Sequence, residues 1–306
     1  MLNKIFKKLS LKYNNEILEK LDVMSMAQAA MLIKENNKKK DITSISDVEF
    51  KVYSQWGEDG IIQYLINNID IKNKYFIEFG VENYTESNTR FLLKNNNWSG
   101  LIIDGDKKNI EYVKKDKIYW RHDLIALNAF ITKDNINQIF MKHGIEGNIG
   151  LLSIDIDGND YWIWKCIEVI EPLIVICEYN SIFGKDYAVT VPYKDNFIRT
   201  REHFSNLYFG ASIKALCLLA KEKGYKFIGS TSAGNDAFFV RNDVSAPFKE
   251  VTVEEGYTVS KFRESRDIKG NLTYVSGVER LNLISEMSLY NIEDDIIYLI
   301  SELYKL

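Results

Sequence analysis

From Ile61 onward, short apolar runs alternate with segments whose apolar residues recur at helical spacing. Short apolar runs bounded by turn residues are typical of buried strands. The pattern predicts strands near 75–79, 100–104, 117–120, 149–155, 173–178, 225–229 and 236–240, with helices between most of them. This alternation indicates an α/β fold with a mostly parallel sheet, helices on both faces, and a ligand crevice at the carboxyl ends of the strands.

The last two predicted strands are joined by the turn-rich segment 230–236. A connection this short makes the pair antiparallel, because parallel neighbours require a long crossover. The sequence therefore predicts a Rossmann-like, seven-stranded sheet that ends in an antiparallel hairpin. A plain dinucleotide-binding fold would continue with parallel crossovers instead.

Both ends of the chain lie outside this pattern. Residues 1–35 contain neither proline nor glycine, and apolar positions such as Ile5, Leu9 and Met31 lie among charges, which predicts helices serving the core or an oligomer contact. The tail ends in the amphipathic stretch 292–306. We expect a helical extension over 1–49, the ligand-binding domain over 50–245, and a cap or helical segment over 246–306. The apolar terminal helices are compatible with a homodimer.

Composition narrows the class of protein. The formal charge of −4 and the pI near 5.6 argue against a nucleic-acid-binding protein, and the lysine run 38–40 is expected in a solvated loop. The 3 cysteines lack CxxC spacing and are expected to be buried, reduced thiols. No run approaches the ~18 apolar residues of a membrane span, and the start of the chain lacks a signal-peptide pattern. These features predict a cytoplasmic protein.

The first candidate site follows the strand at 75–79. Glu78 ends that strand, Gly80 lets the backbone turn closely past a ligand, and Asp104 at the end of the next strand can accept both hydroxyls of a ribose. A dinucleotide fingerprint requires glycines where this chain has Glu82 and Thr85, so S-adenosylmethionine is favoured over NAD. An ordinary strand followed by a turn remains the alternative. Asp106 is a poorer second choice than Asp104 for the ribose.

Asp123 follows the predicted strand at 117–120. There it can accept a hydrogen bond from an adenine amino group. The alternative is a helix N-cap before Leu124.

A second group of polar residues ends two later strands. Asp155 and Asp157 follow the strand at 149–155, and Glu178 and Asn180 follow the one at 173–178. Neighbouring parallel strands bring these side chains to one edge of the sheet, where like charges repel. A divalent metal such as Mg²⁺ or Mn²⁺ would offset them. Two alternatives stay open, namely a carboxylate acting as general base and an aspartate that caps the helix starting near Asn159.

Histidine is scarce, with 3 in the chain. His203 follows the aromatic segment 183–197 and is the first candidate for a general base, against the alternative of a packed or surface histidine. His122 is second, and His143 matches a helix C-terminal residue.

With these residues in view, the chain resembles the FkbM-like S-adenosylmethionine-dependent methyltransferases, in the bacterial branch associated with capsules and surface glycans. The resemblance covers residues 50 to about 285. It rests on the order and spacing of short motifs at Ser54–Gly60, Phe76–Gly80, Ser87–Thr89, Ser153–Gly158, Phe209–Ser212 and Asn235–Arg241.

The resemblance implies a class I methyltransferase fold and methyl transfer to an oxygen, commonly on a sugar. It places around the cofactor Gln55, Glu78, Gly80, Asn88, Asp104 and Asp123. Related sugar and catechol O-methyltransferases hold a divalent ion at the ends of the fourth and fifth strands, where Asp155 and Glu178 fall. In the tail, the resemblance implies that Arg263 and Arg266 hold a diphosphate.

The sequence therefore predicts a cytoplasmic S-adenosylmethionine-dependent O-methyltransferase that modifies a nucleotide-activated sugar in capsular or surface polysaccharide biosynthesis. Asp155 and Glu178 would bind the metal, with Asp157 as a ligand or an orienting residue and His203 as the base. Asn180 is expected to contact the substrate. The alternatives are a metal-dependent glycosyltransferase that uses Asp155-x-Asp157, and a nucleotide-binding protein without turnover.

Overall fold

The computed structural model describes residues 2–306, with side chains from residue 16 onward. The main strands are β1 (Tyr75–Phe79), β2 (Ser99–Asp104), β3 (Leu124–Asn128), β4 (Gly147–Ile154), β5 (Ile170–Glu178), β7 (Tyr225–Ser230) and β8 (Asp236–Arg241). They form a 7-stranded sheet in the order β3-β2-β1-β4-β5-β8-β7. The pairs from β3 to β5 are parallel, and β8 is antiparallel to both β5 and β7. The predicted fold class, a mostly parallel α/β sheet ending in an antiparallel hairpin, is confirmed.

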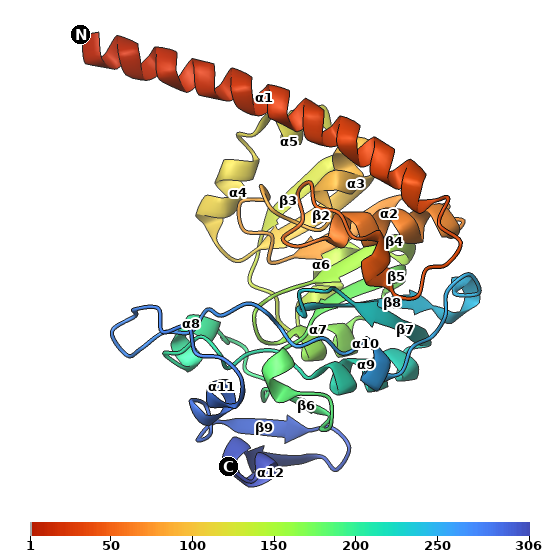
Figure 1. Ribbon diagram of the computed structural model, residues 1–306, viewed down its shortest axis with the longest axis vertical. Helices are drawn as coiled ribbons and strands as arrows, with labels where there is room; N and C mark the ends of the chain where they lie inside the picture. The colour runs from red at the N-terminus through yellow and green to blue at the C-terminus, as the bar shows by residue number, and fades with distance from the viewer. Residues whose placement is uncertain (1) are drawn as a thin grey trace.

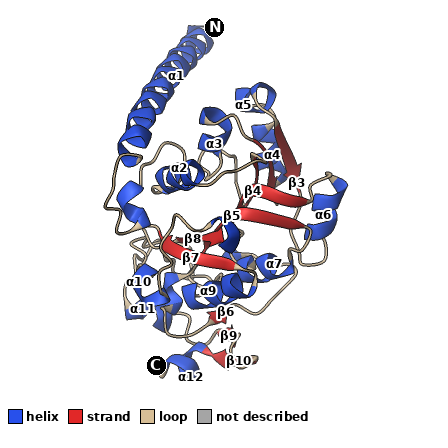
Figure 2. Ribbon diagram, turned by 90° about the vertical axis from the view of Figure 1, so that its right-hand side faces the viewer, coloured by secondary structure: helices blue, strands red, loops and turns tan. Residues whose placement is uncertain are grey.

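Helices cover both faces of this sheet (Figure 1, Figure 2). They are α1 (Leu2–Asn36), α2 (Glu58–Asn68), α3 (Arg90–Asn95), α4 (Lys107–Val113), α5 (Lys117–Arg121), α6 (Ile136–Lys142), α7 (Asp160–Cys166), α8 (Arg199–Glu202), α9 (Ile213–Glu222), α10 (Val253–Gly256), α11 (Val278–Asn282) and α12 (Ile300–Tyr304). Three short 3₁₀ helices lie at Ile45–Val48, Ser181–Phe183 and Asn242–Val244. Among residues 2–306, no helix combines the length and hydropathy needed to cross a membrane.

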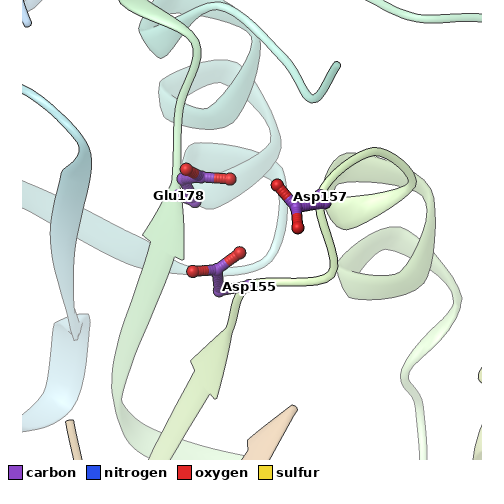
Figure 3. A group of neighbouring side chains, drawn as sticks. All are labelled: Asp155, Asp157 and Glu178. Carbon is purple, nitrogen blue, oxygen red and sulfur yellow. The ribbon is translucent and has the colours of Figure 1, made fainter. Parts of the chain in front are cut away.

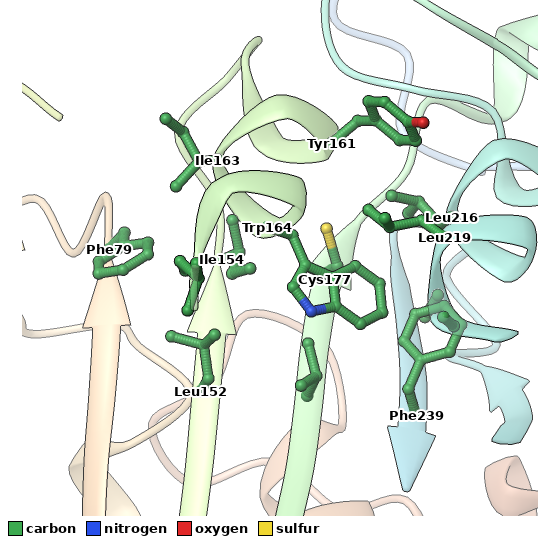
Figure 4. Close-up of a cluster of buried hydrophobic side chains, with 14 of the residues drawn as sticks. Phe79, Leu152, Ile154, Tyr161, Ile163, Trp164, Cys177, Leu216, Leu219 and Phe239 are labelled. Carbon is green, nitrogen blue, oxygen red and sulfur yellow. The ribbon is translucent and has the colours of Figure 1, made fainter. Parts of the chain in front are cut away.

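The core is divided between the two faces because successive strand side chains point in opposite directions. In β1, Ile77 and Phe79 join one buried cluster, whereas Phe76 joins the cluster on the other face. Figure 4 shows part of the first cluster, where Trp164 of α7 packs beside Phe239 of β8 with ring centroids 4.9 Å apart. Both clusters brace the strands whose carboxyl ends carry the polar residues described below.

The third strand differs from its prediction. Residues 117–120 form part of helix α5, and β3 starts at Leu124. Asp116 caps α5 by accepting a hydrogen bond from the backbone N–H of Ile118 (2.9 Å). A short apolar run is compatible with either a strand or a helix, and this cap favours the helix.

The chain end also differs from the predicted helical cap. β6 (Val189–Thr190), β9 (Ser288–Asn291) and β10 (Ile296–Leu299) form a second, 3-stranded antiparallel sheet, and only α12 is helical within 292–306. Asp295 adopts a positive φ of 63° in the turn between β9 and β10, a conformation that Asp and Asn tolerate better than most residues. Because β9 pairs with β6, the tail is joined to the loop that follows β5.

Helix α1 confirms the helical prediction for the N-terminal segment and runs across one side of the molecule (Figure 1). Its C-terminal part packs Ala29 against Phe50 and Phe91. Leu18 and Met31 are exposed. Ile5 and Leu9 lie outside the described side chains.

Candidate active site

A cavity of about 570 Å³ opens at the carboxyl ends of β1, β4 and β5. Its walls come from the loop after β1, the loops after β4 and β5, the β7–β8 turn, and the tail, which contributes Ser260, Phe262, Glu264 and Arg280. A smaller cavity of about 170 Å³ lies at the ends of β2 and β3. The two cavities share lining residues: Gly80, Glu82, Asp155 and Asp157.

Gly80 lies at the junction of the two cavities. Its φ is +68°, and a Cβ placed on it would lie 1.6 Å from the backbone oxygen of Asp155. The glycine is therefore required twice, by its conformation and by the close approach of the β4 end. The predicted role of Gly80 in giving space to a ligand stays a prediction.

Glu78 lines the large cavity, but its carboxylate is already engaged. Oε1 accepts from the backbone N–H of Asn88 (2.7 Å), and Oε2 accepts from the backbone N–H (3.1 Å) and the hydroxyl of Thr89. Burial raises the pKa of Glu78 to about 7, and these hydrogen bonds counteract that effect. Glu78 thus fixes the loop before α3. Asn88 also lines the cavity and donates from Nδ2 to Ser153 (3.1 Å).

Asp104 lines the smaller cavity at the end of β2, as predicted for a ribose ligand. Its Oδ2 accepts from the Glu82 N–H (2.8 Å), and Oδ1 accepts from the Asp106 N–H (2.7 Å) and the Asn109 amide (3.2 Å). A carboxylate has about four acceptor positions, so Asp104 retains capacity for a ligand hydroxyl. Phe130 offers an apolar surface in the same cavity. The smaller cavity therefore offers both an acceptor oxygen and an apolar surface.

The prediction for Asp123 is wrong in position. Asp123 precedes β3, and its carbonyl oxygen accepts from Gly100 at the start of β2. It therefore lies at the amino ends of the strands, opposite the cavities. Asn128 ends β3 instead and donates from Nδ2 to the Asp104 carbonyl (2.9 Å).

The Ser54–Gly60 motif builds a loop over the large cavity. One oxygen of Asp59 accepts three backbone N–H groups, from Val52, Tyr53 and Ser54, at 2.7–2.9 Å. Burial nevertheless raises the pKa of Asp59 to about 6. The loop places Gln55 in the wall of the large cavity, and the cofactor contact that the resemblance implies stays a prediction.

Three carboxylates converge at the ends of β4 and β5. Figure 3 shows Asp155, Asp157 and Glu178 pointing toward one another, with one oxygen of each within 4.8 Å of the others. Burial and the neighbouring Asp157 charge raise the pKa of Asp155 well above its usual value, and burial and Asp155 do the same for Glu178. The predicted convergence of these residues is thus present in the structure.

The helix-capping alternative for these aspartates does not hold. Asp160 organises the turn before α7, because its two oxygens accept from the backbone N–H groups of Ile156 (2.8 Å) and Gly158 (2.9 Å). Asp155 and Asp157 are left facing the cavity. Asp157 has a positive φ of 56°, which turns its side chain away from the strand direction and into the cluster.

Arg199 of α8 supplies a positive charge beside the three carboxylates. Its guanidinium lies 2.6 Å from Asp157 and stacks 3.7 Å above the Phe209 ring. No motif or spacing in the sequence singles out this arginine. A single guanidinium cannot balance three ionised carboxylates, and Oε2 of Glu178 is buried without a hydrogen-bond partner. A hard divalent cation fits this orphaned oxygen and the all-oxygen donor set.

Two predicted residues have other roles. His203 does not line either cavity; its Nδ1 is hydrogen-bonded to the Ser205 hydroxyl (2.7 Å) and its ring packs on Phe204. Asn180 lines the large cavity, but its Nδ2 donates to the Leu207 (2.9 Å) and Phe209 (3.0 Å) carbonyls. Asn180 therefore positions the cavity wall and has no amide hydrogen left for a substrate.

The arginines of the tail are also rearranged relative to the prediction. Arg266 forms an ion pair with Glu264 (2.8 Å), Arg263 is exposed beside Tyr274, and neither lines a cavity. Arg280 lines the large cavity instead. Asp236, within the Asn235–Arg241 motif, also lines the cavity and is paired in register with Glu178.

No protein-family model matches the chain, and no curated protein matches it. Among solved structures, an S-adenosylmethionine-dependent methyltransferase from Clostridium acetobutylicum is similar at 10% identity and a TM-score of 0.39, over 60% of this chain and 90% of that one. The N-terminal domain of EvdMO1 with SAH bound gives 9% identity and 0.41, over 69% and 94%. An O-methyltransferase from Bacillus cereus in complex with SAH gives 10% and 0.36, over 71% and 89%. At such values these similarities say nothing about the substrate or chemistry of this chain.

Proposed function

We propose that the protein is an S-adenosylmethionine-dependent O-methyltransferase of the FkbM-like type, acting on a hydroxyl of a nucleotide-activated sugar for a bacterial capsular or surface polysaccharide. One observation carries this proposal: a cavity of about 170 Å³ at Asp104 adjoins, through Gly80 and Asp155, a larger cavity with three convergent carboxylates. Cofactor and acceptor would thus meet beside the acid cluster.

The proposed division of roles follows from the contacts. Asp104 would accept from the ribose hydroxyls, and Gln55, Glu78, Gly80 and Asn88 would surround the methionine end. S-adenosylmethionine would supply an electrophilic methyl group with a thioether leaving group, and a divalent ion held by Asp155, Asp157 and Glu178 would lower the pKa of the acceptor hydroxyl. The remaining requirement is alignment of that hydroxyl with the methyl group and removal of one proton.

No histidine is found among the residues that line the large cavity, which favours a carboxylate as the proton acceptor. We assign this role to Asp236 in place of His203. Burial and the charges of Glu58 and Asp155 raise the pKa of Asp236 well above its usual value, which makes its carboxylate a stronger base. Asp236 is also outside the group of three carboxylates that would hold the metal.

The test is calorimetric titration of the protein with S-adenosylhomocysteine, with and without Mg²⁺ or Mn²⁺, and with UDP- and GDP-sugars. We expect micromolar binding of S-adenosylhomocysteine, about −8 kcal/mol, without a metal requirement. Metal-dependent binding of a nucleotide sugar without any binding of S-adenosylhomocysteine would refute methyl transfer. That result would favour the glycosyltransferase, for which Asp155-x-Asp157 has the matching form.

A further inference from the structure

Arg280, on helix α11, carries a buried guanidinium whose hydrogen-bonding needs the described residues leave largely unmet. The residue is 8% exposed and lines the large cavity from the side of the tail. Its Nε is buried without a hydrogen-bond partner, and its Nη1 makes a single long hydrogen bond to the Ser260 carbonyl (3.4 Å). Among the described side chains, no carboxylate lies within ion-pairing distance of this guanidinium, whereas Arg199 and Arg266 each have one.

Such an arrangement is costly without a ligand. A guanidinium cannot release its proton under ordinary conditions, so a buried arginine needs an anion or a full set of acceptors. Burial and the nearby Arg199 charge lower the pKa of Arg280, which is the sign of an unmet charge. Glu264, the carboxylate that the tail contributes to the cavity wall, is already paired with Arg266.

Two hydroxyl groups complete a donor set in this part of the cavity. Ser181 and Ser260 both line it. The Ser181 Oγ accepts from the Ser260 N–H (2.9 Å), and the Ser260 Oγ accepts from the Phe262 N–H (3.2 Å). Each hydroxyl therefore serves as an acceptor in these bonds and keeps its own hydrogen for donation. A guanidinium and two hydroxyls match the several terminal oxygens of a phosphate group.

We propose that Arg280, together with Ser181 and Ser260, binds a phosphate group of the acceptor while the acid cluster faces the hydroxyl to be methylated. The inference rests on the proposed function, and it assigns the residues that would hold the phosphate of that acceptor. It also replaces Arg263 and Arg266 as the phosphate-binding residues. The cavity thus has a cationic part on the tail and an anionic part on the sheet.

The probe is inorganic pyrophosphate, titrated by calorimetry into full-length protein in EDTA, with and without saturating S-adenosylhomocysteine. We expect Arg280→Gln to weaken pyrophosphate binding at least tenfold and to leave S-adenosylhomocysteine binding unchanged. Arg280→Lys, which keeps the charge and loses the planar fork, should be intermediate. Arg201→Gln is the matched control, because Arg201 is an exposed arginine that lines neither cavity.

A thermal unfolding series separates binding from folding. Pyrophosphate should raise the melting temperature of the wild type and of Arg201→Gln, but not that of Arg280→Gln, whose own melting temperature should equal or exceed the wild-type value. Unchanged pyrophosphate binding by Arg280→Gln would overturn the proposal. So would an equal loss of S-adenosylhomocysteine binding, which would assign the guanidinium to the cofactor carboxylate.

The two proposals fail in different ways. The protein could bind pyrophosphate through Arg280 and not bind S-adenosylhomocysteine. That result would support the phosphate site and refute methyl transfer. Binding of S-adenosylhomocysteine without any pyrophosphate binding would retain methyl transfer and refute the phosphate site. If Arg280→Gln does not fold, Arg280→Lys supplies the same comparison.

Discussion

Acidic residues end the strands in both halves of the sheet, but they meet opposite environments. In the β1–β2 half, the oxygens of Glu78 and Asp104 accept from backbone N–H groups of the loops that follow. In the β4–β5 half, Asp155, Asp157 and Glu178 face one another, with Arg199 as the nearby cation and one oxygen left without a partner.

The difference shows that position at the strand end does not determine the role of an acid. The oxygens of Glu78 and Asp104 form hydrogen bonds with the loops that shape the cavities. The oxygens of Asp155, Asp157 and Glu178 keep capacity for a ligand. Their negative charges repel one another, and a bound cation would relieve this repulsion. Substitutions in the two halves should therefore have opposite consequences.

The largest expected effect is on turnover in the β4–β5 half. Asp155→Asn should lower methyl transfer about a thousandfold, roughly 4 kcal/mol of transition-state stabilisation, because the cluster would lose one ligand of the proposed metal. The affinity for S-adenosylhomocysteine, measured by calorimetry, should stay within a factor of about two, or ~0.4 kcal/mol.

Asp123→Asn is the matched control for that experiment, since Asp123 lies at the opposite ends of the strands. It should leave both turnover and cofactor affinity unchanged. A drop in cofactor binding with Asp123→Asn would contradict the structural placement of this residue. An equal loss of turnover and of cofactor affinity with Asp155→Asn would mean that Asp155 has only a structural role.

The second effect is the pH dependence that Glu78 adds in the β1–β2 half. The folded protein holds a proton on Glu78 up to a pKa of about 7, whereas the unfolded chain releases it near 4.5. Stability from this group is therefore complete below pH 4.5, lost as the pH rises to about 7, and constant above it. At about 1.4 kcal/mol per pH unit, the loss is roughly 3 kcal/mol.

The difference between wild type and Glu78→Gln in urea unfolding, measured across this pH range, isolates that contribution. A difference that does not change with pH would show that Glu78 is ionised throughout and that its hydrogen bonds outweigh its burial.

The third effect compares the β1–β2 and β4–β5 halves through the free energy of unfolding, measured in EDTA. Thr89→Val removes the hydroxyl that donates to Glu78 and should cost about 1–2 kcal/mol. Glu178→Gln removes a repelling charge and should raise stability by about 1 kcal/mol. Urea unfolding at pH 8 compares the two, with the exposed Glu146→Gln as the neutral control. Destabilisation by Glu178→Gln of the same size as Thr89→Val would remove the contrast between the halves.

The fourth effect is the smallest. Arg263→Gln should change both stability and pyrophosphate affinity by less than about 0.5 kcal/mol, because Arg263 is exposed and lines no cavity. A tenfold loss of pyrophosphate affinity here would restore the assignment that the sequence resemblance implied.

The sequence pattern predicted most strands of the main sheet, its closing antiparallel hairpin and the gathering of acids at one edge. A buried strand is easy to recognise in the sequence, because it is a continuous apolar run followed by a polar residue at the edge of the sheet. Glu78, Asp104, Asp155 and Glu178 could therefore be placed before any coordinates. The third strand and the β9–β10 hairpin could not be placed in this way. Short apolar runs are compatible with either a strand or a helix, and contacts with neighbouring segments decide which one forms.

The roles of the site residues were decided by the tertiary structure. Arg199, Arg280 and Asp236 lie far apart in the chain from the acids they accompany, and His203 and Asn180 are taken up by neighbours that the sequence does not reveal. Residue type and strand position determine which groups reach the edge of the sheet. Which of them remain free for a ligand depends on hydrogen bonds and charges from distant segments, and only the folded chain brings those together.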